Sequence, residues 1–163
     1  MRPAPRRTAL LLAVAVLSLG AVGVALWTQH ALDMQPCPWC VLQRLIFVVI
    51  ALAALPGLVW RHGFVQTLSA LLILGASLAG VAAALWQHFV AAVSSSCNMT
   101  LADRIVGGLK LDGLLPDVFQ ARASCADAAV RLWGLPYEVW SLILFMLIGV
   151  ISLRMLLRRA VTS

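Results

Sequence analysis

Charged residues are scarce in this sequence. Asp, Glu, Lys and Arg make up only 11% of its 163 residues, against about 25% in soluble domains. The apolar residues, 63% of the chain, fall in long runs without charge, and such runs need a bilayer rather than a folded core around them. This composition excludes an ordinary soluble fold, intrinsic disorder, a nucleic-acid-binding module and a large enzyme domain. The chain is predicted to be an integral membrane protein.

Four apolar runs predict four transmembrane helices. They cover residues 8–27, 45–60, 64–86 and 139–153. The first and third reach the roughly 20 residues that cross a bilayer, whereas the second and fourth are short unless they include Arg44 and Arg154, which would then snorkel to the interface. We expect one all-α domain over residues 1–163, a four-transmembrane-helix bundle with spans at about 8–27, 42–60, 64–86 and 137–155. Its two larger loops are then about 28–41 and 87–136.

The second of these loops is long enough to carry structure of its own. A short amphipathic helix is expected there, with four apolar residues on one face: Leu114, Leu115, Val118 and Phe119. Such a helix could lie on the membrane surface. A hydrophobic cluster inside the loop is the alternative.

Acidic residues are missing from both termini and from the turn near residue 61. Seven arginines lie there: Arg2, Arg6, Arg7, Arg61, Arg154, Arg158 and Arg159. Five of the six acidic residues lie in the other two loops, and the sixth, Glu138, lies directly after the second of them. Because cytoplasmic flanks collect Lys and Arg, this asymmetry predicts a multi-pass protein of a bacterial inner membrane with both termini in the cytoplasm. The net charge of +6 therefore reflects orientation in the bilayer and gives no reason to expect a nucleic-acid partner.

The first apolar run has a second interpretation, a cleaved signal peptide. It is longer than the apolar region of about 7 to 15 residues that is typical of signal peptides, and the polar segment after it lacks a small-x-small cleavage site. We therefore expect it to be retained as a transmembrane helix.

Cysteine is absent from the uncharged cores of the spans. All four cysteines fall in the loops predicted to be periplasmic, an oxidising compartment. Cys37 and Cys40 form a CPWC motif at the start of the second helix, while Cys97 and Cys125 lie in the large loop. Two disulfides, one in each loop, are the natural pairing.

Three interpretations of these cysteines compete. As a structural staple, a bridge between Cys97 and Cys125 would stabilise the loop by about 3 to 4 kcal/mol in the chain-entropy model, but a CxxC bridge closes almost no loop. A zinc site is disfavoured because the sequence lacks two paired CxxC motifs, so no metal is expected. A thiol–disulfide relay uses all four positions.

The CPWC motif has features of a reactive pair. Pro38 suits the first turn of a helix, which places Cys37 and Cys40 at a helix N-terminus, where unpaired amides and the helix dipole favour a thiolate. Arg44 follows Cys40 by one helical turn and is predicted to reach back toward its sulfur. The alternative is an arginine that merely snorkels to the interface.

Four stretches of the sequence share one resemblance. They are ALWTQHALDMQPCPWCVLQR at residues 25–44, WQH at residues 86–88, LDGLLPDVF at residues 111–119 and PYEVW at residues 136–140. Together they closely resemble the DsbB family of bacterial disulfide bond formation proteins, and the resemblance covers nearly the whole chain. It implies a four-helix inner-membrane enzyme that reoxidises the periplasmic thiol oxidase DsbA and passes electrons to ubiquinone or menaquinone. Such a DsbA–DsbB–quinone route is what keeps the bacterial periplasm oxidising.

The resemblance also implies roles for individual residues. Cys37 and Cys40 match the quinone-coupled pair, Cys97 matches the sulfur attacked by DsbA, and Cys125 matches its disulfide partner. Arg44 matches a residue beside the quinone, and His88 matches a family histidine near it. The residues inside the CxxC and the length of the loop between Cys97 and Cys125 vary within the family, so redox potential and choice of DsbA partner stay open.

Two other functions remain as alternatives. A thiol–quinone reductase of the vitamin K epoxide reductase type runs similar chemistry on another topology, but its CxxC lies late in the chain. A non-enzymatic membrane module with disulfide-stapled loops is the other. The sequence has no haem, flavin or iron–sulfur motif that could replace a quinone as electron acceptor.

Overall fold

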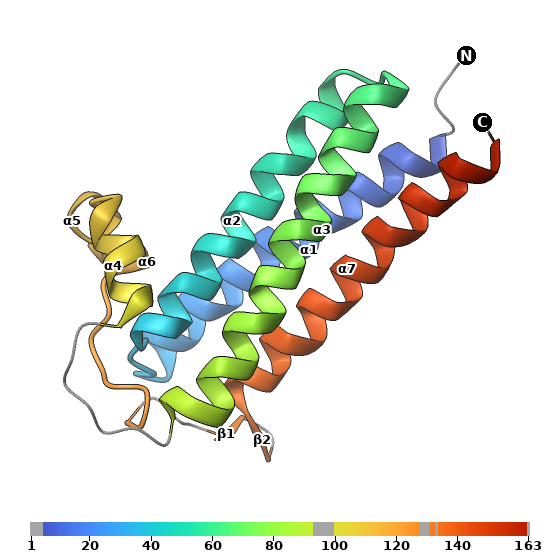
Figure 1. Cartoon of the computed structure of the whole chain (residues 1–163). Helices are drawn as coiled ribbons and strands as arrows, with labels where there is room; N and C mark the ends of the chain where they lie inside the picture. Colours follow the sequence, from blue (N-terminus) through green and yellow to red (C-terminus); the bar gives the residue numbers. More distant parts are fainter. Residues whose placement is uncertain (1–4, 93–99, 128–130, 133, 163) are drawn as a thin grey trace.

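The computed structural model describes residues 5–92, 100–127, 131–132 and 134–162. Long helices form a bundle (Figure 1): α1 (Pro5–Ala31), α2 (Pro38–Val59), α3 (Gly63–Trp86) and α7 (Tyr137–Thr162). Four segments of the described chain are long and apolar enough to cross a bilayer, Arg6–Ala31, Pro38–Val59, Gly63–Ala91 and Tyr137–Leu157. The prediction of a four-helix membrane bundle is confirmed.

The helices extend beyond the apolar runs. Helix α1 continues to Ala31, and α2 begins at Pro38, so the first loop is shorter than residues 28–41. Cys37 caps α2 because its side chain accepts a hydrogen bond from the Cys40 N–H, and Pro38 occupies the first turn. Arg44 is only 6% exposed. It therefore lies inside the protein, not in a snorkelling position.

In the core of the bundle, two aromatic rings stack and a glycine allows two helices to pack closely. Phe47 of α2 and Phe145 of α7 stack with ring centroids 4.1 Å apart and an interplanar angle of 7°. A Cβ atom at Gly80 of α3 would lie 2.5 Å from the Phe145 ring. The absence of a side chain at Gly80 therefore lets α7 approach α3 closely, as small residues do in membrane bundles.

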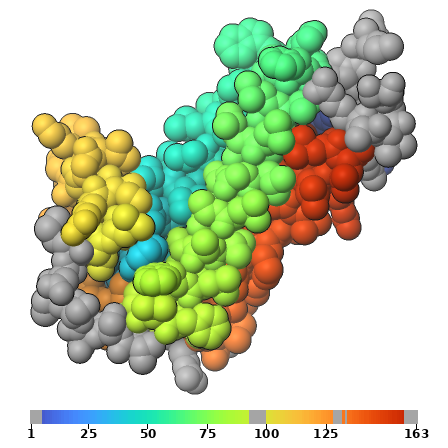
Figure 2. Space-filling model, viewed as in Figure 1, coloured from blue at the N-terminus to red at the C-terminus, as the bar shows by residue number. Residues whose placement is uncertain are grey.

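Three short helices follow α3 and stand beside the N-terminal part of α2 (Figures 1 and 2): α4 (Leu101–Gly108), α5 (Leu111–Leu114) and α6 (Pro116–Phe119). The single amphipathic helix expected around residues 114–119 is instead two short helices. Leu115 has φ −136° between them, because a residue before proline is held away from the α conformation. Phe119 is buried against Val41 and Val106, whereas Leu114 and Leu115 are exposed.

A small antiparallel strand pair leads into α7. Strands β1 (Arg131–Leu132) and β2 (Leu135–Pro136) pair with Leu132 opposite Leu135. Gly134 between them has φ +84°, a conformation that glycine adopts without steric cost.

The two ends of the bundle differ in character (Figure 1). The start of α1, the end of α7 and the α2–α3 turn lie at one end, while α4 to α6 and the strand pair lie at the other, next to the start of α2. This arrangement matches an even number of spans with both termini on one side. That this side is the cytoplasm stays a prediction.

Candidate functional site

The CPWC motif forms the first turn of α2. The Sγ atoms of Cys37 and Cys40 lie 2.6 Å apart, and the Cys40 N–H lies 3.3 Å from Cys37 Sγ, to which it donates. Cys37 is fully buried. The sequence-based placement of both sulfurs at a helix N-terminus agrees with this geometry.

Cys125 is brought to this pair from the second loop. The loop is held against the first one by the N–H groups of Arg122 and Ala123, which donate to Pro36 C=O at 2.9 and 3.3 Å. The thiols of Cys37 and Cys125 belong to the same buried cluster, and their interaction raises the pKa of Cys37 and lowers the pKa of Cys125. Cys125 is thus the better thiolate of the two and is in contact with Cys37. Cys97 lies outside the described residues.

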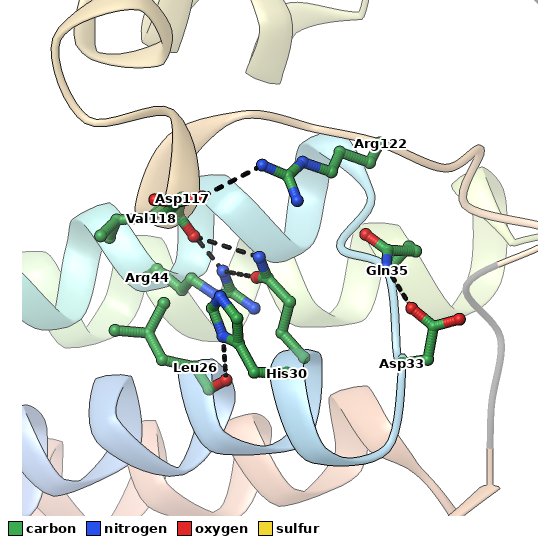
Figure 3. A network of polar contacts seen from close by, with 9 residues as sticks. Leu26, His30, Asp33, Gln35, Arg44, Asp117, Val118 and Arg122 are labelled. Atoms are coloured by element: carbon green, nitrogen blue, oxygen red, sulfur yellow. Dashed lines mark hydrogen bonds and ion pairs between the residues drawn. The ribbon is translucent and has the colours of Figure 1, made fainter.

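Arg44 is bound by segments on both sides of it rather than by the CPWC sulfurs. Its Nη1 donates to Val118 C=O at 3.2 Å (Figure 3) and to Gln29 Oε1 at 2.7 Å. Its Nη2 donates to Ala25 C=O at 3.2 Å. Gln29 in turn donates to Asp117 C=O at 3.1 Å. Arg44 therefore links α1, α2 and α6. Its guanidinium makes these hydrogen bonds instead of one to Cys40, and it interacts with the Cys40 thiol through its charge.

The side-chain amides of two buried glutamines form a hydrogen-bonded chain that ends at Cys40. Gln87 Nε2 donates to Cys40 Sγ at 3.3 Å, and Gln43 Nε2 donates to Gln87 Oε1 at 2.7 Å. Gln87 opens a π-helical turn, η1 (Gln87–Ala91), in which Ala92 N–H bonds to Gln87 C=O. Single π turns of this kind are frequent at functional sites.

A cavity of about 950 Å³ begins at this polar cluster. Cys40, Gln43, Arg44 and Gln87 line it together with Glu138, and the remaining lining residues are mostly apolar and come mainly from α1, α7 and the loop between α1 and α2. Val16 and Leu147 on these walls are 61% and 47% exposed, and they belong to candidate membrane spans. The cavity therefore combines a polar end at Cys40 with walls that face the bilayer.

His88 lies beside this cavity and lines a second, smaller one of about 220 Å³. Its Nδ1 is 2.9 Å from Glu138 Oε1. The carboxylate is buried, at 5% exposure, whereas the imidazole is 42% exposed. Glu138 lines both cavities, so His88 is separated from the larger cavity by its acidic partner.

These residues fit a quinone. Ligand cavities of roughly 300 to 1,000 Å³ with mostly apolar walls and a few convergent polar groups are typical of small-molecule sites. Here the polar end offers N–H donors to carbonyl oxygens, from Arg44 and the two amides, beside a cysteine sulfur. Long apolar walls on α1 and α7 suit an isoprenoid tail. Cys40, Gln43, Arg44 and Gln87 are the residues that would hold the ring.

Sequence reasoning missed four polar residues of this site: Gln29, Gln43, Gln87 and Glu138. Each is 5% exposed or less. One signal was present, because polar residues within or next to membrane spans are costly and usually functional. The sequence alone, however, does not show which of them face one another.

Comparisons with known proteins agree with the geometry. A family model described as "Disulfide bond formation protein DsbB" matches residues 6–155. The chain is similar to disulfide bond formation protein B of Aromatoleum aromaticum, 33% identical over 158 residues, which cover 93% of each chain. It is also similar to the protein of that name in Herminiimonas arsenicoxydans, 34% identical over 150 residues, with 91% of this chain and 94% of the relative covered.

Proposed function

The chain belongs to the DsbB family of disulfide bond formation proteins, and we propose that its four cysteines carry electrons from the periplasmic thiol oxidase DsbA to a membrane quinone. Membership makes it a membrane protein-disulfide oxidoreductase. One observation carries the proposal: Cys125 contacts Cys37, while Cys40 lines the large cavity. Cys125, the partner in disulfide exchange, therefore approaches the CPWC motif at Cys37, whereas the cavity is lined by Cys40.

The first steps exchange disulfides. A DsbA thiolate attacks Cys97, which forms a mixed disulfide and releases Cys125 as a thiolate. Cys125 attacks Cys37, the Cys37–Cys40 bond breaks, and Cys40 is released as a thiolate. The second DsbA thiol then displaces Cys97, leaving DsbA oxidised. Cys97 finally attacks Cys125, which restores the loop disulfide and leaves Cys37 and Cys40 reduced.

The last step reoxidises this pair. A bound ubiquinone or menaquinone would accept two electrons and two protons as Cys37 and Cys40 form their disulfide again. Arg44, buried and always charged, favours the negative charge that appears at the polar end of the cavity. The bilayer-facing walls of α1 and α7 give an apolar acceptor a route to and from the site.

Sidedness follows from the same proposal. DsbA is periplasmic, so the end that carries α4 to α6 and the CPWC motif faces the periplasm, and the α2–α3 turn with Arg61 faces the cytoplasm. The excess of arginine at the end that holds the α2–α3 turn and both termini supports this orientation.

Trapping of thiols tests the relay. Purified protein is mixed with reduced DsbA, with and without ubiquinone, and quenched at intervals with an alkylating reagent whose mass separates free thiols from disulfides. Rapid, quinone-dependent cycling of all four cysteines is expected. Bridges that stay intact throughout would refute the relay and favour a disulfide-stapled module.

A further inference from the structure

Gln87 is, among the described residues, the side chain outside the CPWC motif that donates a hydrogen bond to Cys40 Sγ. It is 4% exposed and is the first residue of η1, directly after α3, whereas Cys40 comes from the start of α2. A buried donor next to a sulfur stabilises the thiolate over the thiol, because hydrogen bonds to a charged acceptor are stronger than those to a neutral one.

Gln43 decides which way the Gln87 amide points. An amide carries both a donor and an acceptor, and the hydrogen-bond network around it determines their orientation. Gln43 Nε2 donates to Gln87 Oε1 at 2.7 Å, which occupies the oxygen and leaves the Gln87 NH₂ group toward Cys40. Gln43 is 3% exposed and lies one turn from Cys40 on the same helix.

The uncharged nature of both side chains matters. A carboxylate at either position would bring negative charge beside a sulfur that has to become negative itself, and like charges at a buried site disfavour ionisation. Arg44 does not donate a hydrogen bond to Cys40 Sγ in place of Gln87, because its hydrogen bonds go to Gln29, Ala25 and Val118.

We propose that Gln87 is a catalytic residue that stabilises the Cys40 thiolate through its side-chain amide, and that Gln43 is the positioning residue that orients this amide. The proposal rests on the proposed function of Cys40 as the thiol that reduces the quinone. It leaves the stoichiometry unchanged: Cys37 and Cys40 lose two electrons and two protons as their disulfide forms, and the quinone takes up both.

The experiment measures Cys40 itself, without DsbA or quinone. In a Cys37→Ser, Cys97→Ser, Cys125→Ser background, Cys40 is the remaining thiol, and its rate of alkylation by iodoacetamide at pH 7 reports its thiolate character. Gln87→Leu should slow this rate about tenfold, a typical effect of one lost hydrogen bond. Gln87→Glu should slow it further, and Gln43→Leu should slow it by a smaller factor.

A second readout uses the CPWC pair in a Cys97→Ser, Cys125→Ser background equilibrated with glutathione. Loss of Gln87 destabilises the reduced pair, so its reduction potential should become more negative by about 30 mV, the equivalent of a tenfold change in equilibrium constant. Gln66→Leu is the matched control, because Gln66 is a buried glutamine of α3, the helix that precedes η1, and it bonds to Thr8 and Gly57 instead. Gln66→Leu should change neither the alkylation rate of Cys40 nor the reduction potential of the CPWC pair.

Unchanged alkylation and potential in Gln87→Leu would overturn the proposal. If this variant does not fold, Gln87→Asn, which keeps an amide but withdraws it from the sulfur, takes its place with the same expectation. An equal effect of Gln66→Leu would also overturn it, since a general loss of packing would then be the cause. Failure of the proposed relay would appear differently, as normal Cys40 chemistry without transfer of electrons from DsbA.

Discussion

Replacement of Arg44 offers the sharpest test of the proposed quinone site. Arg44→Met removes the charge and leaves three acceptors without their donor, buried ones on Ala25 and Gln29 and a half-buried one on Val118. A hydrogen bond to a charged group contributes about 1.5 to 3 kcal/mol, which corresponds to roughly ten- to a hundred-fold in affinity or turnover. We expect a loss of that size in kcat/KM for quinone. Arg44→Lys should lose less, because it keeps a charge but not the planar fork.

The assay follows DsbA oxidation at limiting and at saturating ubiquinone, with a single-turnover measurement of thiol exchange between DsbA and the protein. The defect should appear mainly at limiting quinone. Thiol exchange should keep its normal rate, because the Cys125 segment is held separately by Pro36 C=O. Arg61→Met is the matched control, since Arg61 is an exposed arginine of the α2–α3 turn, and it should be neutral.

A double-mutant cycle with Gln29 shows whether Arg44 acts through its observed position. Gln29→Leu removes the 2.7 Å acceptor and should lower kcat/KM for quinone in the parent protein but have little further effect in Arg44→Met. Contacting residues show coupling of about 0.5 to 3 kcal/mol. Additive effects, or normal activity of Arg44→Met at limiting quinone, would refute the assignment.

Three other predictions concern the thiols, the bundle and the orientation. In a Cys97→Ser background, which leaves Cys125 without its disulfide partner, Cys37→Ala removes the interaction that lowers the Cys125 pKa, so the pH profile of Cys125 alkylation should move to higher pH; an unchanged profile contradicts the contact. Gly80→Ala should destabilise the protein by about 1 to 3 kcal/mol through overpacking against Phe145, whereas Gly75→Ala, with open space around it, should not; thermal unfolding in detergent compares them. A phosphatase fusion at Gly63 should be inactive, and periplasmic activity there would reverse the predicted topology.

Much of the architecture followed from local pattern. Long uncharged apolar runs admit one stable arrangement in a bilayer, the helix, because each backbone polar group must be satisfied within the segment. Pro38 after Cys37 likewise determines a helix start, since proline suits the first turn and Cys37 provides the cap. The four spans and the helical position of the CPWC motif were therefore predictable from neighbouring residues alone.

Other features depended on residues far apart in the chain. Arg44 was expected to turn toward Cys40, one helical turn away, but acceptors on α1 and α6 bind its guanidinium instead. Gln87 was not distinguished from other polar residues until its contact with Cys40, 47 positions earlier, was known. A long side chain has several rotamers of similar energy, and which one is stable depends on the partners that packing brings within reach. Local sequence pattern is therefore enough to locate the helices and the cysteines, but the polar groups that surround Cys40 are known only once the chain is packed, because Gln87 comes from a helical turn distant in sequence.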